Sequence, residues 1–158
     1  AGFLLNNEMD DFSASPNSPN HRGLLGGDAN AIAPNKRMLS SMAPTIVTRN
    51  GKLFMVLGTP GGATIPTAVF QTLLNVIDHG MGAQQAVTAP RFHHQWYPDT
   101  IRAEVHAIAS ADSLELVRMG HAFKKSSNIG RVDAILVLPD GRMEAGADPR
   151  GDDSAGGY

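Results

Sequence analysis

The chain has 158 residues, of which 42% are hydrophobic and 18% are charged; its formal net charge is −2 at pH 7 and its pI is near 6.3. This length is sufficient for one domain with a hydrophobic core, and the near-neutral charge with few basic pairs argues against a nucleic-acid partner. The absence of cysteine excludes disulfides, thiol catalysis and cysteine metal sites, and no apolar run is long enough to span a membrane.

Acidic residues crowd near the start of the chain. Phe3–Leu5 are expected to end a strand, and Glu8, Asp10 and Asp11 follow within a few residues. Such carboxylates either lie in a solvated turn, with Asp11 or Ser13 capping a short helical turn, or they hold an ammonium group or a metal ion.

Two irregular segments, residues 15–27 and 28–37, lead to a pair of serines. The first is rich in glycine and proline, and a loop of its length is either disordered or a functional lid. Ser40 and Ser41 stand between apolar neighbours. Their hydroxyls either satisfy local backbone groups or, together with backbone N–H groups, face a carboxylate.

A β-hairpin is the clearest local prediction. Thr45–Thr48 and Leu53–Leu57 have the composition of strands, and the segment between them contains Asn50-Gly51, a strong signal for a hairpin turn.

The second strand leads into a glycine turn that is followed by an amphipathic helix from Ile65 to His79. Gly61 and Gly62 leave backbone N–H groups at the helix N-terminus, which can hold an anion or a developing oxyanion, although such glycines often serve only tight turning and close packing. The sequence motifs of phosphate loops and of dinucleotide sites are absent. The expected buried face of the helix consists of Ile65, Ala68, Val69, Leu73, Val76 and Ile77.

The remaining elements alternate between helices and strands. Gly80 is expected to end the long helix, and Pro90 to stop a short helix over Ala83–Thr88. His93 and His94 are adjacent in an extended segment, so they point to opposite faces and are not expected to share a metal. We further expect a strand over Ile101–Val105, a helix over Ser110–Met119 with Ser110 as N-cap, a strand over Val132–Leu138, a turn at Pro139–Gly141 and a loop from Asp148 to Tyr158 without calcium-site spacing. This order favours an α+β or layered α/β domain.

Five motifs, in this order, give the chain its resemblance to the C-terminal part of the small subunit of gamma-glutamyltranspeptidases, an N-terminal-nucleophile hydrolase family with an αββα sandwich. The motifs are Leu4–Phe12, Pro34–Thr45, Pro60–Gly62, Ala89–Trp96 and Asp148–Arg150. The resemblance implies an α+β fold that is part of such a sandwich. It also implies one domain over residues 1–158, with substrate-binding loops and a lid in residues 1–44 and the sheet and helices in residues 45–158.

The resemblance also implies roles for individual residues. Gly61 and Gly62 supply the oxyanion hole, Ser40 and Ser41 bind the α-carboxylate of a γ-glutamyl group, and Glu8 with Asp11 binds its α-ammonium group. The loop from Pro16 to Gly27 falls where family members can carry a lid. No metal and no cofactor are implied.

One departure from the family concerns the nucleophile. The family's catalytic threonine is the first residue of the small subunit, whereas this chain begins with Ala1. The resemblance therefore implies a piece of a self-cleaving zymogen that is inactive alone. The expected partners are the large subunit, the missing N-terminal part of the small subunit and a glutathione-like substrate, with self-association if the chain is crystallised alone. The expected location is periplasmic or extracellular.

The expected activity of the parent protein is acyl transfer. It would cleave γ-glutamyl peptides such as glutathione and pass the glutamyl group to water or to an amino acceptor. A related acylase, a poly-γ-glutamate depolymerase and a non-catalytic binding or assembly domain of the same fold are the alternatives.

Overall fold

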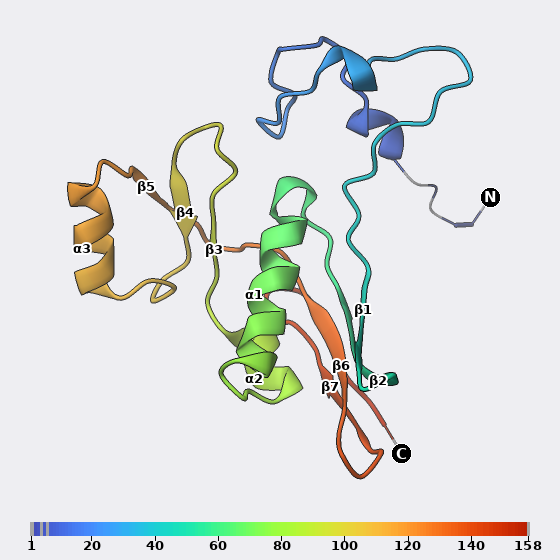
Figure 1. Ribbon diagram of the computed structural model, residues 1–158, viewed down its shortest axis with the longest axis vertical. Helices are drawn as coiled ribbons and strands as arrows, with labels where there is room; N and C mark the ends of the chain where they lie inside the picture. The colour runs from blue at the N-terminus through green and yellow to red at the C-terminus, as the bar shows by residue number, and fades with distance from the viewer. Residues whose placement is uncertain (1, 4, 6, 158) are drawn as a thin grey trace. The chain divides into compact units, whose positions relative to one another are not determined.

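A computed structural model describes residues 2–3, 5 and 7–157 of the chain. The chain divides into two compact units, residues 1–41 and residues 42–158, which we describe separately (Figure 1). The division falls near the predicted boundary at residue 44, and the single domain over residues 1–158 stays a prediction.

The first unit consists mostly of loops. Its regular elements are two short 3₁₀ helices, η1 (Glu8–Asp11) and η2 (Asp28–Asn30). The segment expected to be a loop folds back on itself, because the Asn17 N–H donates to the Gly26 carbonyl at 2.7 Å and the Asn20 N–H to the Leu24 carbonyl at 2.9 Å.

The strand predicted over Phe3–Leu5 is wrong for Phe3 and Leu5, and Leu4 lies outside the described residues. The Phe3 and Leu5 side chains are 68% and 81% exposed. Among the described residues nothing buries these two side chains, so no packing favours an extended conformation here.

The second unit contains a four-stranded antiparallel sheet in the order β1-β2-β6-β7. Its strands are β1 (Thr45–Arg49), β2 (Lys52–Gly58), β6 (Asp133–Val137) and β7 (Met143–Gly146). The predicted hairpin is confirmed: Asn50 and Gly51 have φ values of 54° and 75°, and a tight two-residue turn needs positive φ at both positions. The predicted turn after β6 is confirmed as well, since Leu138 donates to the Arg142 carbonyl at 2.8 Å.

Two helices, α1 (Ile65–Ile77) and α2 (Ala83–Thr88), pack on one face of this sheet and form the core (Figure 1). Most of the predicted buried face of α1 is confirmed, with Leu73 partly buried. The predicted burial of Ile77 is wrong, since this side chain is 44% exposed at the last residue of the helix. The smaller Thr72 is buried instead.

The opposite face of the sheet carries a row of apolar side chains. Ile46 pairs with Val56, and Val56 pairs with Ile135, so these three residues lie side by side across β1, β2 and β6. They are 71%, 37% and 44% exposed. The sheet is thus covered by helices on one face and apolar on the other.

A second sheet has the order β3-β4-β5, with β3 (Phe92–His93), β4 (Ile101–Ala103) and β5 (Phe123–Lys125). β4 and β5 are parallel, and α3 (Ser110–Arg118) lies between them in the chain. The predicted strand over Ile101–Val105 ends at Ala103, because the chain then turns and Ala107 donates to the Glu104 carbonyl. Ser110 is the first helical residue and not the N-cap, which is Ala109.

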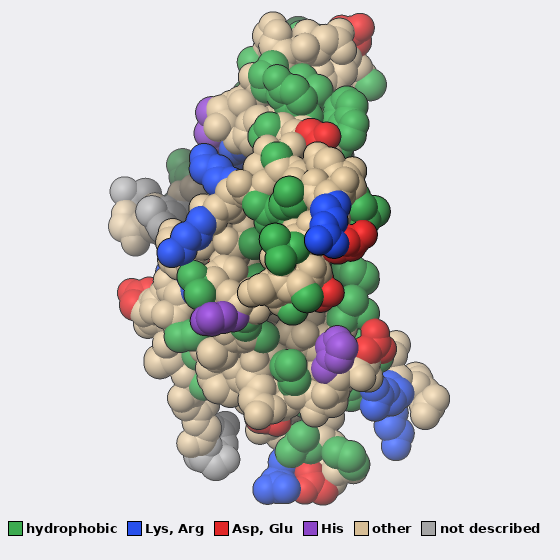
Figure 2. All heavy atoms as spheres, turned by 90° about the vertical axis from the view of Figure 1, so that its left-hand side faces the viewer, with side chains coloured by type: hydrophobic (Ala, Val, Ile, Leu, Met, Phe, Trp, Pro, Cys, Tyr) green, Lys and Arg blue, Asp and Glu red, His purple; other side chains and the backbone are tan. Residues whose placement is uncertain are grey.

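The α+β fold class is confirmed by these elements. On the face that carries α3, basic and acidic side chains are interspersed, and the basic ones do not gather into one patch (Figure 2). Within the described ranges, no helix has the length and apolar character needed to cross a membrane.

Candidate functional site

Two carboxylates and two serines lie together in the first unit. Ser40 Oγ donates a hydrogen bond to Glu8 Oε1 at 2.7 Å. Ser41 donates to Asp11 Oδ2 from both its Oγ and its backbone N–H, each at 3.1 Å. The structure thus brings the four predicted ligand residues together as two acid–serine pairs that are formed by distant parts of this unit.

Asn30 fixes this arrangement. Its Nδ2 donates to the Asp11 carbonyl at 2.6 Å, and its Oδ1 accepts the Leu39 N–H at 2.9 Å. One side chain therefore ties η1 to the segment that carries the serines. The sequence analysis missed Asn30, because an asparagine in an irregular segment belongs to no periodic pattern.

The alternative in which Asp11 or Ser13 caps a short helical turn is wrong. The N-cap of η1 is Asn7, which makes no side-chain capping bond, and Asp11 lies inside the turn and accepts from Ser41 instead. Ser13 Oγ is buried and has no hydrogen-bond partner among the described residues.

A pocket of about 200 Å³ opens beside Asp11 and Ser41. The folded-back loop lines another part of it through Pro19, Asn20 and Leu24. The pocket therefore offers a carboxylate, a hydroxyl and apolar walls to a small polar ligand, within one unit of the chain.

The glycine turn lies between β2 and α1 and includes the 3₁₀ helix η3 (Gly62–Thr64). Gly61 and Gly62 have φ values of 144° and 59°, which residues with side chains rarely adopt. A Cβ at Gly61 would lie 2.6 Å from Thr64 Oγ1. Both glycines are thus required by the backbone conformation of the turn.

The hydrogen bonds of this turn use its carbonyl groups. Thr59 Oγ1 donates to the Pro60 carbonyl at 2.6 Å, and Thr64 Oγ1 donates to the Gly61 carbonyl at 3.1 Å. No hydrogen bond among the described residues uses the N–H of Gly61 or Gly62. A pocket lined by Gly61, Thr64 and Arg131 lies against the turn, so a ligand can reach it. These features suit the binding of an anion or an oxyanion.

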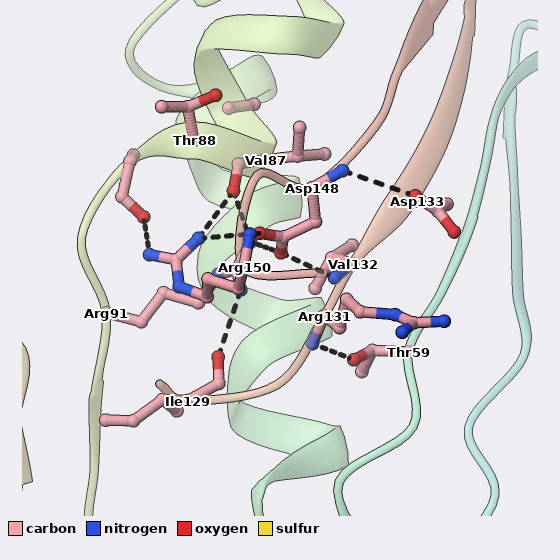
Figure 3. A network of polar contacts seen from close by, with 12 residues as sticks. Thr59, Val87, Thr88, Arg91, Ile129, Arg131, Val132, Asp133, Asp148 and Arg150 are labelled. Carbon is pink, nitrogen blue, oxygen red and sulfur yellow. Dashed lines mark hydrogen bonds and ion pairs between the residues drawn. The ribbon is translucent and has the colours of Figure 1, made fainter. Parts of the chain in front are cut away.

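A buried cluster of two arginines and two carboxylates supports the neighbouring chain segment, and Figure 3 shows three of its members, Arg91, Arg150 and Asp148. Arg91 pairs with Asp148 at 2.8 Å, and both side chains are fully buried. Arg150 pairs with Asp148 at 3.0 Å and with Glu104. Each charge thus has an opposite charge beside it, which offsets the cost of removing it from water.

The cluster holds the segment from Ile129 to Val132 at both ends. Arg91 Nη1 donates to the Ile129 carbonyl at 3.0 Å, and the Ile129 N–H donates to Glu104 Oε1 at 2.7 Å. At the other end, the Val132 N–H donates to Asp148 Oδ2 at 2.7 Å (Figure 3).

This segment lies against the glycine turn. Gly130 has a φ of 70°, and a Cβ there would lie 2.9 Å from Ala68 Cβ and 3.1 Å from Thr59 Oγ1. The Arg131 N–H donates to Thr59 Oγ1 at 2.6 Å. The buried cluster is therefore connected to the turn through residues 129–131.

Sequence reasoning gave no role to these four charged residues. Arg91, Asp148 and Arg150 belong to motifs that carried the family resemblance, but Asp148 was expected in an open loop and Glu104 inside a strand. Asp148 is fully buried in the structure. The only signal in the sequence was that these three residues belong to motifs that carry the family resemblance. Their pairing depends on contacts between distant parts of the chain.

The two histidines have different partners. His93 is buried, with its Nδ1 2.8 Å from Thr67 Oγ1, whereas His94 Nε2 lies 2.9 Å from Asp99 Oδ1. Burial lowers the pKa of His93, so its ring is neutral at pH 7 and holds β3 against α1. In the part of the chain that the structure describes, no group of three His, Asp or Glu side chains is placed to hold a metal ion.

The carboxylates of the cluster are held in their charged form. Burial alone would raise the pKa of Glu104, but hydrogen bonds from the Arg150 side chain and from the N–H groups of Arg91 and Ile129 outweigh it and lower this pKa. The pKa of Asp148 is also lowered despite its burial, by the N–H groups of Arg150 and Val132 and by the charge of Arg91.

We expect the cluster to make the fold sensitive to acid. A carboxylate with a lowered folded-state pKa contributes stability above its unfolded pKa of about 4, and this contribution is lost as the pH falls through the lower folded value. Urea unfolding measured from about pH 6 down to about pH 3 should therefore show a free energy of unfolding that falls with the pH. Glu104→Gln should make this fall shallower, and a parallel loss in both proteins would contradict the assignment.

Comparisons with known proteins identify the family that the chain matches. The sequence profile of the family described as Gamma-glutamyltranspeptidase matches residues 1–158. The chain is 50% identical over 160 residues to the glutathione hydrolase proenzyme of Escherichia coli K12, covering 100% of this chain and 27% of that protein. It is 51% identical over 155 residues to the glutathione hydrolase proenzyme of Pseudomonas aeruginosa, covering 96% of this chain and 28% of that protein.

Among solved structures, a mutant gamma-glutamyltranspeptidase from Helicobacter pylori matches with a TM-score of 0.89 and 52% sequence identity. The match covers 96% of this chain and 83% of that chain. The chain spans about a quarter of the length of the curated relatives it matches.

Proposed function

This chain belongs to the gamma-glutamyltranspeptidase family, and we propose that it is the part of a γ-glutamyl acyl-transfer enzyme that supplies the glutamyl-binding residues and the oxyanion hole. The parent enzyme cleaves γ-glutamyl peptides such as glutathione and passes the glutamyl group to water or to an amino acceptor. The observation that carries this proposal is the pairing of Glu8 with Ser40 and of Asp11 with Ser41, the second of which lines a pocket of about 200 Å³.

The four residues suit the charged end of a glutamyl group. The carboxylates of Glu8 and Asp11 attract an ammonium group, and the hydroxyls of Ser40 and Ser41 can donate to a carboxylate. In the structure each serine donates to an acid. When a ligand arrives, a serine hydroxyl can turn from its acid to the ligand carboxylate, and the acid then accepts from the ligand ammonium in its place.

The glycine turn suits the acyl-transfer step. A tetrahedral intermediate carries its negative charge on the former carbonyl oxygen, and two backbone N–H groups at a fixed turn stabilise this charge without reorganisation. We assign this role to the N–H groups of Gly61 and Gly62. The carbonyls of the same two peptide units, those of Pro60 and Gly61, accept hydrogen bonds that hold the turn.

The remaining parts of the proposed enzyme come from outside this chain. The chain is part of a larger architecture in its relatives, of which it spans about a quarter. We propose that the large subunit and the upstream part of the small subunit, with the threonine nucleophile, complete the enzyme. The apolar row of Ile46, Val56 and Ile135 suits burial against such additional structure. We further propose a periplasmic or extracellular location.

Charge recognition by Asp11 can be tested against its neighbour. We expect Asp11→Ala to raise the KM for a γ-glutamyl anilide by about 10- to 100-fold, because loss of a hydrogen bond to a charged group costs about 1.5–3 kcal/mol. Asp10→Ala is the matched control, since Asp10 is an exposed residue of the same 3₁₀ helix. The measurement is steady-state kinetics on the protein expressed from its full reading frame.

Equal effects of the two substitutions would contradict this assignment. A loss of kcat with unchanged KM after Asp11→Ala would also contradict it, because that pattern reports an interaction made only in the transition state.

A further inference from the structure

We propose that Thr59 and Thr64 each orient one of the two oxyanion N–H donors, by holding the carbonyl at the other end of the same peptide unit. They are positioning residues: their hydroxyls act through the backbone. The inference rests on the proposed function, because it assigns the N–H groups of Gly61 and Gly62 to the oxyanion.

The first peptide unit joins Pro60 to Gly61. A trans peptide is planar, so its C=O and N–H point in opposite directions, and fixing one fixes the other. Thr59 Oγ1 donates to the Pro60 carbonyl at 2.6 Å. This bond therefore sets the direction of the Gly61 N–H.

The second peptide unit joins Gly61 to Gly62. Its carbonyl accepts from Thr64 twice, from Oγ1 at 3.1 Å and from the backbone N–H at 3.3 Å. Thr64 is only 5% exposed, so packing holds this residue in place. The Gly62 N–H therefore points away from Thr64 in a fixed direction.

Such anchoring is needed because the turn has no side chains of its own at these positions. Glycine rotates about φ and ψ with little steric restriction, so the Pro60–Gly61 and Gly61–Gly62 peptide units can reorient at low cost when unbonded. An oxyanion hole works only if its donors already point to the place where the charge develops. The two threonines supply this restriction.

Thr59 is itself held by the segment next to the buried cluster. Its Oγ1 accepts the Arg131 N–H at 2.6 Å, and a hydroxyl that accepts at its oxygen keeps its single proton for one acceptor, which here is Pro60. The Ile129 carbonyl accepts from Arg91, and the Val132 N–H donates to Asp148 (Figure 3). The Ile129 N–H donates to Glu104. The orientation of the Gly61 N–H thus depends on a chain of contacts that ends in the buried ion pairs.

Substitutions that differ only in the hydroxyl test this inference. Thr59→Val and Thr64→Val keep the side-chain shape and remove the donor, whereas Thr59→Ser and Thr64→Ser keep the donor. We expect each valine variant to lower kcat about 10-fold or more with KM changed less than about threefold, since full loss of an oxyanion donor costs about 10²–10³-fold. The serine variants should keep most of kcat.

Thr72→Val is the matched control. Thr72 lies on α1, is fully buried, and its Oγ1 has no hydrogen-bond partner in the described part of the chain. Its valine variant should leave kcat and KM unchanged. If Thr59→Val fails to fold, Thr59→Ala removes the same hydroxyl without adding bulk and gives the same comparison.

The experiment uses the protein expressed from its full reading frame, with a γ-glutamyl anilide as substrate and a tetrahedral boronate analogue of the glutamyl group as inhibitor. The valine variants should lose affinity for the boronate by about the factor lost in kcat, which a general loss of stability would not produce. A rise in KM alone, or equal losses in the serine and valine variants, would overturn the inference and leave the proposed function standing. A wild-type protein without γ-glutamyl activity would overturn both.

Discussion

Gly61→Ala is expected to lower kcat for γ-glutamyl transfer by about 10²–10³-fold, the usual effect of losing one oxyanion donor. The φ of 144° at this position is unfavourable for any residue with a Cβ, and the added atom would meet Thr64 Oγ1 at 2.6 Å. The substitution thus displaces both the Gly61 N–H and the hydroxyl that holds the next peptide unit. Single-turnover kinetics with a γ-glutamyl anilide would measure the chemical step directly.

Gly58→Ala gives the control for this experiment. Gly58 ends β2 only three residues earlier, and a Cβ there would meet no atom within 4 Å. We expect its kinetics to match those of the wild type. An unchanged kcat in Gly61→Ala, with only substrate affinity reduced, would refute the oxyanion role.

Arg91→Met is expected to lower the free energy of unfolding by about 3–5 kcal/mol, the range for breaking a buried ion pair from one side. Methionine fills much of the same space, but the fully buried Asp148 then loses one of its two arginine partners, the one at 2.8 Å, and keeps only Arg150. The Ile129 carbonyl also loses its donor. Urea unfolding of the protein expressed from its full reading frame would measure the loss.

An exposed ion pair supplies the comparison. Arg118 pairs with Glu115 at 3.2 Å on α3, where the side chains are 78% and 62% exposed. Arg118→Met should cost no more than about 1 kcal/mol, since water already solvates both charges. If the two arginine variants lose the same stability, the buried cluster does not have the structural role described above.

The sequence predicted the elements whose signal is local. The hairpin followed from Asn50-Gly51, because the positive φ values of its tight turn favour these two residue types. Helix α1 followed from its apolar periodicity, and the error at Ile77 arose because the helix ends two residues before the predicted end. The fold class followed from the order of these elements.

The missed elements depend on distant partners. Strands β3 and β5 have only two and three residues, too few to show an alternating pattern. Strands β4 and β5 pair in parallel although α3 separates them in the sequence. The residue types of the candidate site were predicted from their chemistry and the family resemblance. The support of Asp11 by Asn30 and the burial of Asp148 were not, because both arise from contacts between separate segments.

The order of the cluster residues along the chain has a consequence for biosynthesis. Arg91 and Glu104 leave the ribosome well before Asp148 and Arg150, which complete the ion pairs. Until Asp148 has been translated, Arg91 lacks its carboxylate partner and the Val132 N–H lacks its acceptor. The nascent chain can therefore form its hairpin and α1 early, while the backbone that orients the glycine turn becomes fixed only after Asp148 and Arg150 have been translated.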